Sequence, residues 1–407
     1  MKRSQLRSLV VPSILLLVIA AGCARPPVIE IRRRQPAVKK DYGRALPPGA
    51  PALRLITDPA RLPDFRPAFG QDRHALLAAL DHSIRWFTYP SSKKYYPIQE
   101  ITHERAQRSL AAFREILLSA KSAEEFHQRI ISQFDVYESV GCDDEGTVLF
   151  TGYYTPIFDG RLAPDAEFRW PLYKLPPDLV KDEEGNCLGR RTEDGSIVPY
   201  YTRAEIEAGV LRGLELVWLR DRFEAYICTV QGSAKLRLPD GTLYSIGYHG
   251  NNGKPYTSIG QLLVNDGLIQ PEDLSLAGLI KFFRDRPDLL DTYLPKNERY
   301  VFFRPAEGDP TGSLGVPVTP YCTLATDKAI FPRGCLTYVV TQLPSVLPGE
   351  RVRQMPFERF LLDQDTGGGI RAPGRADVYV GVGDAAGLVA GHTFSEGRLY
   401  YIFLRGM

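Results

Sequence analysis

The sequence is poor in cysteine and has almost no net charge. Lysine and arginine total 50 and aspartate and glutamate 48, so the formal net charge is +2 and nothing indicates a nucleic-acid partner. A hydrophobic fraction of 44% excludes a disordered or collagen-like chain. At about 100–200 residues per domain, the length of 407 residues predicts two or three domains.

Six cysteines are too few and too far apart for a dense disulfide scaffold. The five cysteines other than Cys23 form no CxxC pair and show no spacing with a histidine pair, so no zinc site is predicted. Two alternatives remain for the others: one or two disulfides, with Cys322 and Cys335 as the first pair to test, or free buried thiols. The five are Cys142, Cys187, Cys228, Cys322 and Cys335.

Motifs of several common enzyme classes are also absent. The six histidines form no HExxH pattern, and the chain has no GxSxG, which removes the usual basis for a metalloprotease or serine hydrolase. The stretch from Gly247 to Lys254 resembles a P-loop but has one residue too many, and Pro255 replaces the Ser or Thr that would hold magnesium. We therefore expect no nucleotide site.

The N-terminal residues 1–22 have the pattern of a secretory signal peptide. Basic residues precede an apolar run over 9–21 that is too short for a typical membrane span. Small residues directly before Cys23 resemble a bacterial lipobox, which predicts a lipidated N-terminal cysteine; cleavage by ordinary signal peptidase near Ala21 is the alternative. Residues 23–53 are rich in proline and arginine and predict a tether.

Apolar residues at spacings of three and four predict three helices ahead of a mainly β remainder. Ser122 and Glu125 form a capping box at the start of the third helix. Further on, Asp240-Gly241 predicts a hairpin turn, residues 274–286 one more helix and residues 399–404 a last buried strand. The apolar sets are Leu77, Leu80, Ile84 and Phe87; Ala106, Leu110, Phe113 and Leu117; and Phe126, Ile130 and Phe134.

Three polar, aromatic and glycine-rich clusters lie in regions predicted to be β, over residues 150–156, 231–233 and 250–260. Flat apolar rings beside short neutral polar groups are typical of carbohydrate sites. Turn residues and strand tyrosines are the alternative interpretation. The candidate binding residues are Tyr153, Tyr154, Thr155, Gln231, Ser233, Asn252, Tyr256 and Ser258.

A segment over residues 363–391 combines aspartates with many glycines. The glycines allow tight turns that would bring Asp365, Asp377 and Asp384 near one another. Neighbouring carboxylates raise one another's pKa, and a carboxylic acid that stays protonated near neutral pH can donate a proton to a glycosidic oxygen. Aspartates that cap loops are the alternative.

The order of these motifs resembles the membrane-bound lytic murein transglycosylase A family, from about residue 145 to the end. The motifs are Gly152-Tyr153-Tyr154-Thr155-Pro156, Gln231-Gly232-Ser233, Tyr256-Thr257-Ser258-Ile259-Gly260, Val301-Phe302-Phe303-Arg304, Ala325-Thr326-Asp327 and the three-aspartate segment. The resemblance implies a mainly β fold with N-terminal helices, in which a second, smaller β-barrel is inserted into a double-psi β-barrel and a glycan groove runs between them.

On this pattern the double-psi β-barrel takes residues 54–165 and 305–407 and contains the 3D segment 363–391, while the inserted barrel takes residues 166–304. The resemblance also implies that Asp377 is the catalytic acid and base, Asp365 a second aspartate that keeps its pKa high, and Asp384 the third.

The implied function is a lytic transglycosylase that cleaves the β-1,4 bond between N-acetylmuramic acid and N-acetylglucosamine and leaves 1,6-anhydromuramyl ends. Two alternatives stay open: a peptidoglycan hydrolase that uses water, and a non-catalytic glycan-binding envelope lipoprotein. The expected partners are peptidoglycan strands, a membrane through the lipid on Cys23 and a wall-remodelling protein complex. Ala24 favours the outer membrane, facing the periplasm. No metal or organic cofactor is expected.

Overall fold

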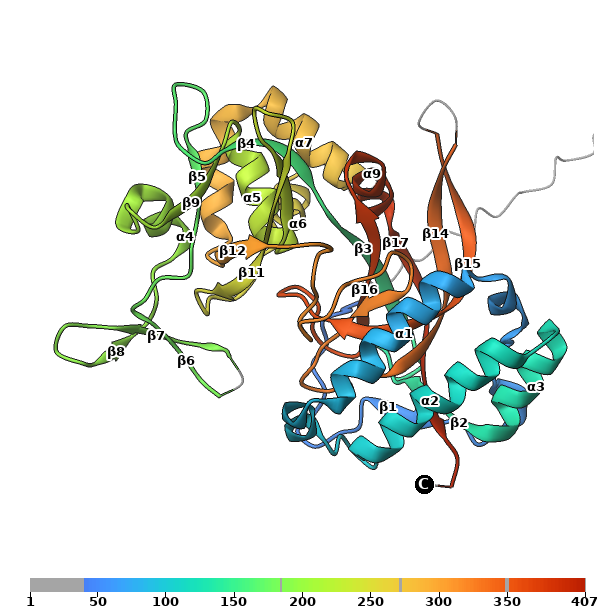
Figure 1. The fold of residues 1–407 in the computed structure, drawn as a ribbon. Helices are drawn as coiled ribbons and strands as arrows, with labels where there is room; N and C mark the ends of the chain where they lie inside the picture. The colour runs from blue at the N-terminus through green and yellow to red at the C-terminus, as the bar shows by residue number, and fades with distance from the viewer. Residues whose placement is uncertain (1–39, 184, 271–272, 348–350, 407) are drawn as a thin grey trace, which may run out of the picture. The chain divides into compact units, whose positions relative to one another are not determined.

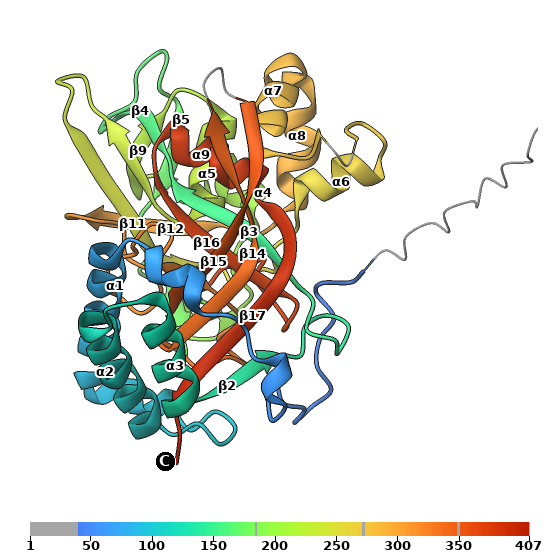
Figure 2. The same ribbon diagram turned by 90° about the vertical axis from the view of Figure 1, so that its right-hand side faces the viewer.

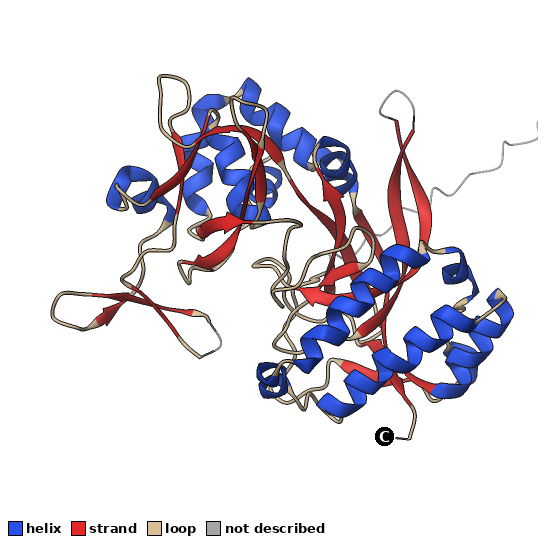
Figure 3. Cartoon of the chain, in the orientation of Figure 1, coloured by secondary structure: helices blue, strands red, loops and turns tan. Residues whose placement is uncertain are grey.

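The computed structural model describes residues 40–183, 185–270, 273–347 and 351–406. The predicted signal peptide and the expected lipidation site at Cys23 lie outside these residues. Figure 1 follows the chain from its N-terminal helices into two parts built around sheets, and Figure 3 shows strands running through both parts with helices packed around them. Within the described ranges, no helix has the length and apolar character needed to span a membrane.

The first sheet closes into a six-stranded barrel. Its ring runs β17-β14-β15-β13-β16-β3, and β3 pairs again with β17 to complete the circle. Two of the pairings, β13 with β15 and β16 with β3, are parallel, and the others in the ring are antiparallel. The short strands β1 and β2 extend this sheet beside β17. The strands are β1 (Leu53–Leu55), β2 (Phe134–Ser139), β3 (Val148–Thr155), β13 (Thr323–Ala325), β14 (Leu336–Leu347), β15 (Arg351–Asp365), β16 (Arg375–Val382) and β17 (Phe394–Leu404).

The second sheet is a barrel of shorter strands, in the order β12-β11-β10-β4-β9-β5. A parallel bridge between Lys174, next to β5, and Phe303 of β12 closes it. All its strands lie between β3 and β13 in the chain, so it is inserted into the first barrel. The predicted fold class is therefore confirmed. The strands are β4 (Ile157–Arg161), β5 (Trp170–Tyr173), β9 (Glu215–Leu219), β10 (Ala234–Arg237), β11 (Leu243–Asn251) and β12 (Val301–Ala306).

A small three-stranded sheet and several helices complete the inserted part. The hairpin predicted at Asp240-Gly241 is present between β10 and β11, where Gly241 has a φ of +83°. The remaining elements are β6 (Leu179–Lys181), β7 (Cys187–Arg191), β8 (Ile197–Val198), α4 (Arg203–Glu205), α5 (Arg222–Gln231), α6 (Ile259–Asn265), α7 (Leu276–Asp285) and α8 (Leu290–Tyr293).

The three predicted N-terminal helices are present as α1 (Arg73–Thr88), α2 (His103–Ser119) and α3 (Ala123–Gln133). Figures 1 and 2 show them together on one side of the first barrel. Their apolar faces form one core with it, in which the rings of Phe113 and Phe360 lie 4.6 Å apart. This packing explains the periodicity, because an amphipathic helix is stabilised mainly by the face that it buries.

Some local predictions were wrong. Ser122 caps α3 by accepting from the Glu125 N–H, but the Glu125 carboxylate accepts from Lys121 instead of completing the capping box. Phe134 begins β2 and does not belong to the third helix. Residues in the clusters predicted to be β form the end of α5 and the start of α6, and the helix α9 (Asp384–His392) was not predicted. The helix predicted over 274–286 is α7.

The structure decides between the two alternatives for the cysteines, disulfides or free thiols. All five described cysteines are free thiols, so Cys322 and Cys335 form no disulfide. Burial raises the pKa of Cys322 to about 11 and raises that of Cys335 further still. These thiols therefore behave as small apolar core side chains and not as nucleophiles.

Residues 40–53, the last part of the predicted tether, make contacts with the first barrel. Lys40 and Tyr42 both donate hydrogen bonds to Glu396 of β17, at 3.0 and 2.8 Å. Ala52 is 1% exposed, and Leu53 begins β1. The folded part of the described chain therefore begins ahead of β1.

Candidate active site

Strand β13 brings two of the three predicted aspartates together. Ala325 of β13 pairs with Asp365 at the end of β15 on one side and with Asp377 of β16 on the other. The two carboxylates thus come from strands that flank the same residue. The glycine-rich stretch between them forms no strand. It carries the chain from one side of β13 to the other.

Asp365 is held by three hydrogen-bond donors. The Tyr153 hydroxyl donates to Oδ2 at 2.8 Å, and the backbone N–H groups of Ser313 and Thr366 donate to Oδ1, each at 2.8 Å. Burial nonetheless raises the pKa of Asp365 above its ordinary value, although these three donors oppose the shift. Asp365 is therefore a fixed carboxylate with its oxygens directed at protein donors.

Asp377 is the less satisfied of the two carboxylates. Its Oδ1 is shielded from solvent and accepts no hydrogen bond within the described parts of the chain. Burial raises the pKa of Asp377 to about 7; Asp365 contributes in the same direction, while Arg375 and Thr151 oppose it. A carboxyl group with this pKa keeps its proton in much of the population at neutral pH, which is the requirement for a general acid.

A line of hydroxyl groups runs from the first barrel to the second. Thr155 Oγ1 lies 3.2 Å from Tyr379 Oη and 3.2 Å from Ser233 Oγ. The rings of Tyr153 and Tyr379 are 5.1 Å apart. Because Tyr379 follows Asp377 by two residues on β16, this line starts on the face of the strand that carries Asp377.

Two of the predicted binding residues, Tyr154 and Gln231, are hydrogen-bonded to each other. Tyr154 is 5% exposed, and its backbone N–H donates to Gln231 Oε1 at 3.2 Å. Gln231 is the last residue of α5, and Gly232 ends that helix with a φ of +80°. The Gln-Gly-Ser motif is thus the C-terminal end of α5, and not part of a strand as predicted. Through Gln231, this helix end is hydrogen-bonded to β3.

Tyr256 lies beside the turn that follows Asp365. A Cβ atom added at Gly369 would come within 3.0 Å of the Tyr256 ring, so the glycine permits the contact. Asp377 is close enough to Tyr256 for its charge to raise the pKa of the tyrosine, for which burial is the largest cause. Ser258 is exposed and caps α6 by accepting from the Gln261 N–H at 3.2 Å.

Asn252 does not have the role that the sequence predicted. It is 2% exposed, and its amide nitrogen donates to the carbonyl oxygens of Tyr201 and Glu298 at 2.9 and 2.8 Å. Its Oδ1 accepts from the Tyr300 N–H at 2.9 Å. With both ends of the amide occupied, Asn252 holds two backbone segments together and has no group free for a sugar hydroxyl.

Asp384 lies outside the contacts that join the other two aspartates. It is the first residue of α9, and its side chain is exposed. A carboxylate in the first turn interacts favourably with the positive end of the helix dipole. The structure therefore brings Asp365 and Asp377 together and places Asp384 at the start of a helix.

Four groups at the site were not predicted: Arg375, Arg299, Thr151 and the Ser313 N–H. Arg375 donates to Thr151 Oγ1 at 3.3 Å and lies two residues before Asp377 on β16, so the alternation of a strand would have placed both on one face. No sequence pattern could have identified Ser313, because its backbone and not its side chain makes the contact. Within the described ranges, no three or more His, Cys, Asp or Glu side chains gather in a way that could hold a metal ion.

Two family models match the chain. The MltA specific insert domain matches residues 149–304, which span the second barrel, and the 3D domain matches residues 322–403, which contain Asp365, Asp377 and Asp384. Together they cover more than half of the sequence.

Proteins of known name are similar over most of their length. The membrane-bound lytic murein transglycosylase A of Vibrio cholerae is 34% identical over 269 residues, 65% of this chain and 67% of that protein. The protein of the same name from Escherichia coli K12 is 30% identical over 272 residues, 66% of this chain and 69% of that protein.

Solved structures share the fold. A membrane-bound lytic murein transglycosylase from Agrobacterium tumefaciens superposes with a TM-score of 0.71 at 27% identity, covering 87% of this chain and 98% of that one. The E. coli MltA structure with bound chitohexaose has the same fold and superposes with a TM-score of 0.66 at 24% identity, covering 91% of this chain and 97% of that one. The chain therefore belongs to the membrane-bound lytic murein transglycosylase A family.

Proposed function

We propose that this protein is a lytic transglycosylase that cleaves the β-1,4 bond between N-acetylmuramic acid and N-acetylglucosamine in peptidoglycan. The observation that carries the proposal is the state of Asp377, a shielded carboxyl group with a raised pKa and one oxygen without a partner among the described residues. Membership of the family supports the same conclusion.

A single carboxyl group can perform both proton transfers of this reaction. Asp377 donates its proton to the glycosidic oxygen as the bond from that oxygen to C1 of the muramyl residue breaks. Asp377 then accepts the proton of the muramyl C6 hydroxyl while O6 forms a new bond to C1. The products are a free 4-hydroxyl group and a 1,6-anhydromuramyl end, and the starting protonation state of Asp377 is restored without water.

Asp365 acts on Asp377 through its charge. Tyr153 and two backbone N–H groups fix Asp365 and favour its charged form, and that charge favours the protonated form of Asp377. We assign no proton transfer to Asp384, which is exposed at the start of α9.

The glycan strand, in this proposal, binds along the polar groups between the two barrels. Tyr153 and Tyr256 supply rings, and the Ser233 hydroxyl supplies a hydrogen bond. Tyr379 and Thr155 are each 1% exposed, so they support these groups from within the core. Ser258 and Gln231 are further candidates, and Asn252 is not, because its amide is occupied.

We also propose an arrangement of the whole chain in the cell envelope. Residues 1–22 direct export, Cys23 carries the lipid, and the segment after it links a membrane, the outer membrane in this proposal, to the two barrels. The inserted domain, expected over residues 166–304, in this proposal also takes β4 and the end of β12, because both strands pair in the second barrel. The rest of residues 54–165 and 305–407 forms the other domain. A wall-remodelling protein complex is a further proposed partner.

Mass spectrometry of the muropeptides released from purified peptidoglycan tests the reaction. The full chain should release 1,6-anhydromuramyl products, and Asp377→Ala should release none. Reducing ends in place of anhydro ends would replace this proposal with a hydrolase that uses water. Binding to the wall without any release would replace it with a structural, glycan-binding role.

A further inference from the structure

Arg299 is a positively charged residue beside the turn that follows Asp365. A Cβ atom added at Gly368 would come within 2.8 Å of Arg299 Nε, so the guanidinium lies directly against this turn. On the same turn, Gly369 contacts Tyr256, which lies within reach of the charge of Asp377. Arg299 therefore borders the candidate active site from the second barrel.

The guanidinium of Arg299 has no acidic partner in the described part of the chain. Its hydrogen bond there goes to a neutral acceptor, the Lys254 carbonyl oxygen, at 3.1 Å. Two other buried or half-buried arginines are paired with carboxylates, Arg105 with Asp135 and Arg222 with Glu207, each at 2.8 Å. Arg333 and Arg375, like Arg299, form no ion pair within the described residues, but only Arg299 approaches the site from the second barrel. A charge that is withdrawn from water in a protein is usually paired with an opposite charge. The Arg299 guanidinium therefore still has N–H donors that can bind an anion.

A second positive charge lies close by. Arg371, on the stretch between Asp365 and Asp377, is near enough to contribute to a lowered pKa of Arg299, for which burial is the largest cause. Arg371 is itself 3.6 Å from Asp327, so among the described residues Arg299 is the guanidinium at this turn that lacks a carboxylate. A bound anion would offset both the burial of Arg299 and its repulsion from Arg371.

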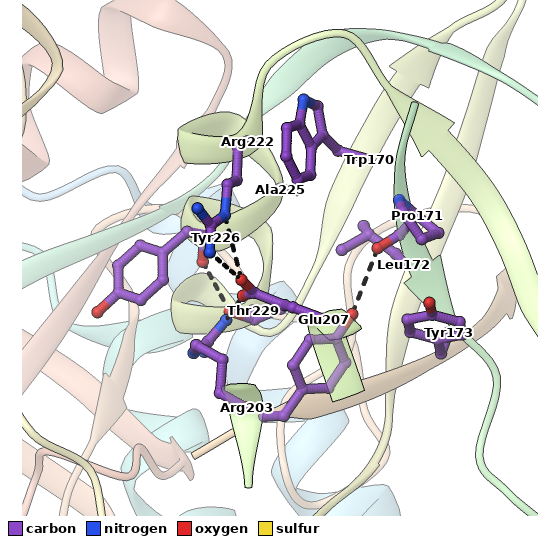
Figure 4. Close-up of a pocket in the computed structure, with 11 residues that line it drawn as sticks. Trp170, Pro171, Leu172, Tyr173, Arg203, Glu207, Arg222, Ala225, Tyr226 and Thr229 are labelled. Atoms are coloured by element: carbon purple, nitrogen blue, oxygen red, sulfur yellow. Dashed lines mark hydrogen bonds and ion pairs between the residues drawn. The ribbon is translucent and has the colours of Figure 1, made fainter. Parts of the chain in front are cut away.

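The backbone that carries Arg299 is fixed from behind by Arg203, a side chain that is 1% exposed. Arg203 donates to the carbonyl oxygens of Asn297 and Arg299, at 2.9 and 2.5 Å. It also contacts Thr229 at 2.9 Å and Glu207 at 3.2 Å, and Figure 4 shows its side chain directed at both. Arg203 therefore fixes the backbone at Arg299 through contacts within the protein itself.

We propose that Arg299 binds a carboxylate group of the peptidoglycan strand, and that Arg203 is the positioning residue that holds it for this purpose. The inference rests on the proposed function for the identity of the polymer. Peptidoglycan offers two kinds of carboxylate, the lactyl group of muramic acid when it carries no peptide and the free acids of the stem peptides. Chitin, a polymer of N-acetylglucosamine, offers neither, so it serves as the neutral comparison.

Binding measurements on the full chain test this without requiring turnover. In an Asp377→Asn background, titration calorimetry would compare four ligands: peptide-free muramyl strands, peptide-bearing strands, the same strands with amidated acids, and chitohexaose. Arg299→Gln should weaken binding of carboxylate-bearing strands about 10-fold to 100-fold. It should leave the affinity for chitohexaose within about twofold.

The ligands separate the two sources. A loss confined to peptide-free strands identifies the lactyl carboxylate, and a loss confined to peptide-bearing strands, absent after amidation, identifies the stem-peptide acids. An equal loss for chitohexaose would overturn the proposal, since it would mean that Arg299 serves the fold or a neutral contact. So would unchanged binding of every ligand.

Two control variants separate a specific effect of Arg299 from a general loss of charge and from a folding defect. Arg304→Gln removes an exposed arginine from β12 and should change none of the affinities. Arg299→Lys keeps the charge and should retain part of the preference for carboxylate strands, which guards against a folding defect in Arg299→Gln. If the wild type binds carboxylate strands in this way but releases no anhydromuramyl product from peptidoglycan, the proposed reaction fails and the binding site stands.

Discussion

The hydroxyl group of Tyr153 donates a hydrogen bond of 2.8 Å to Asp365, and the charge of Asp365 helps to raise the pKa of Asp377. Tyr153 lies on β3, which pairs with the Asp377 strand β16. A change at one carboxylate is therefore expected to appear in the titration of the other.

Asp365→Asn should move the pH dependence of the reaction. Because the negative charge that favours protonated Asp377 is removed, the pKa of Asp377 should fall. The decline of kcat/KM at high pH, expected near pH 7 for the wild type, should then occur at lower pH. The measurement is kcat/KM on soluble peptidoglycan strands across pH. Asp384→Asn, an exposed control on α9, should leave the decline in place; an unmoved decline in Asp365→Asn would contradict the coupling.

Asp377→Asn should raise stability while lowering activity. The folded protein keeps the Asp377 proton up to about pH 7, whereas the unfolded chain releases it near the ordinary pKa of 3.8. Stability from this group is therefore complete below the unfolded value and decreases as pH rises towards 7. Above pH 7 the asparagine variant should be more stable than the wild type by roughly 2–4 kcal/mol.

Urea unfolding near pH 4 and pH 8 measures this difference, which should nearly vanish at the lower pH. Loss of the general acid should lower kcat at least about 100-fold. Equal stability differences at both pH values would show that Asp377 does not titrate as described.

Gly369→Ala should disturb substrate binding by displacing Tyr256. The added methyl group would lie 3.0 Å from the tyrosine ring, closer than an ordinary contact. We expect a stability loss of about 1 kcal/mol and a KM raised several-fold on peptidoglycan. Gly70→Ala is the matched control, because nothing lies within 4 Å of its added methyl group. If both variants behave alike, Tyr256 is not held by this contact.

Arg203→Met and Arg105→Met compare two buried arginines that each contact aromatic rings and carbonyl groups. Each should lose about 3–5 kcal/mol of unfolding free energy, because buried acceptors and a carboxylate lose their partner. KM for peptide-bearing strands, measured at a temperature where both variants remain folded, should rise only for Arg203→Met. A rise of the same size in both would remove the positioning role.

The thiols should be insensitive to redox conditions. Since the five described cysteines are free, a reductant should leave the melting temperature of the protein unchanged. In the folded protein iodoacetamide should modify half-exposed Cys187 first and Cys228, which has no exposed surface, last. Peptide mapping gives the order. A mass lower by two hydrogens that reductant restores would reveal a disulfide.

The sequence predicted elements well where a face is buried along a regular period. The helices α1, α2 and α3 each bury one amphipathic face against the first barrel, and that face is visible in the spacing of their apolar residues. Helix α9 was missed because it is short and contains Gly387 and Gly391, which suggest a loop. Gly387 is needed there because an added Cβ would lie 2.9 Å from the Tyr154 ring, a contact that no local pattern reveals.

The site was predicted in part. The motif order pointed to Asp365 and Asp377, and strand pairing brings them together on either side of Ala325. The role of Asn252 was wrong because amides that bind sugars and amides that tie loops together look alike in a sequence. Arg299 was missed because its position depends on tertiary contacts with Gly368 and Arg203.

The last strand of the chain also determines when the first barrel can form. Strand β17 (Phe394–Leu404) pairs with β2, β3 and β14, so the ring stays open until the final residues are available. During synthesis, the second barrel, with all its strands between residues 157 and 306, is complete about 90 residues earlier. A ribosome that stops early, or a protease that trims the C-terminus, would therefore leave a folded second barrel attached to an unclosed one.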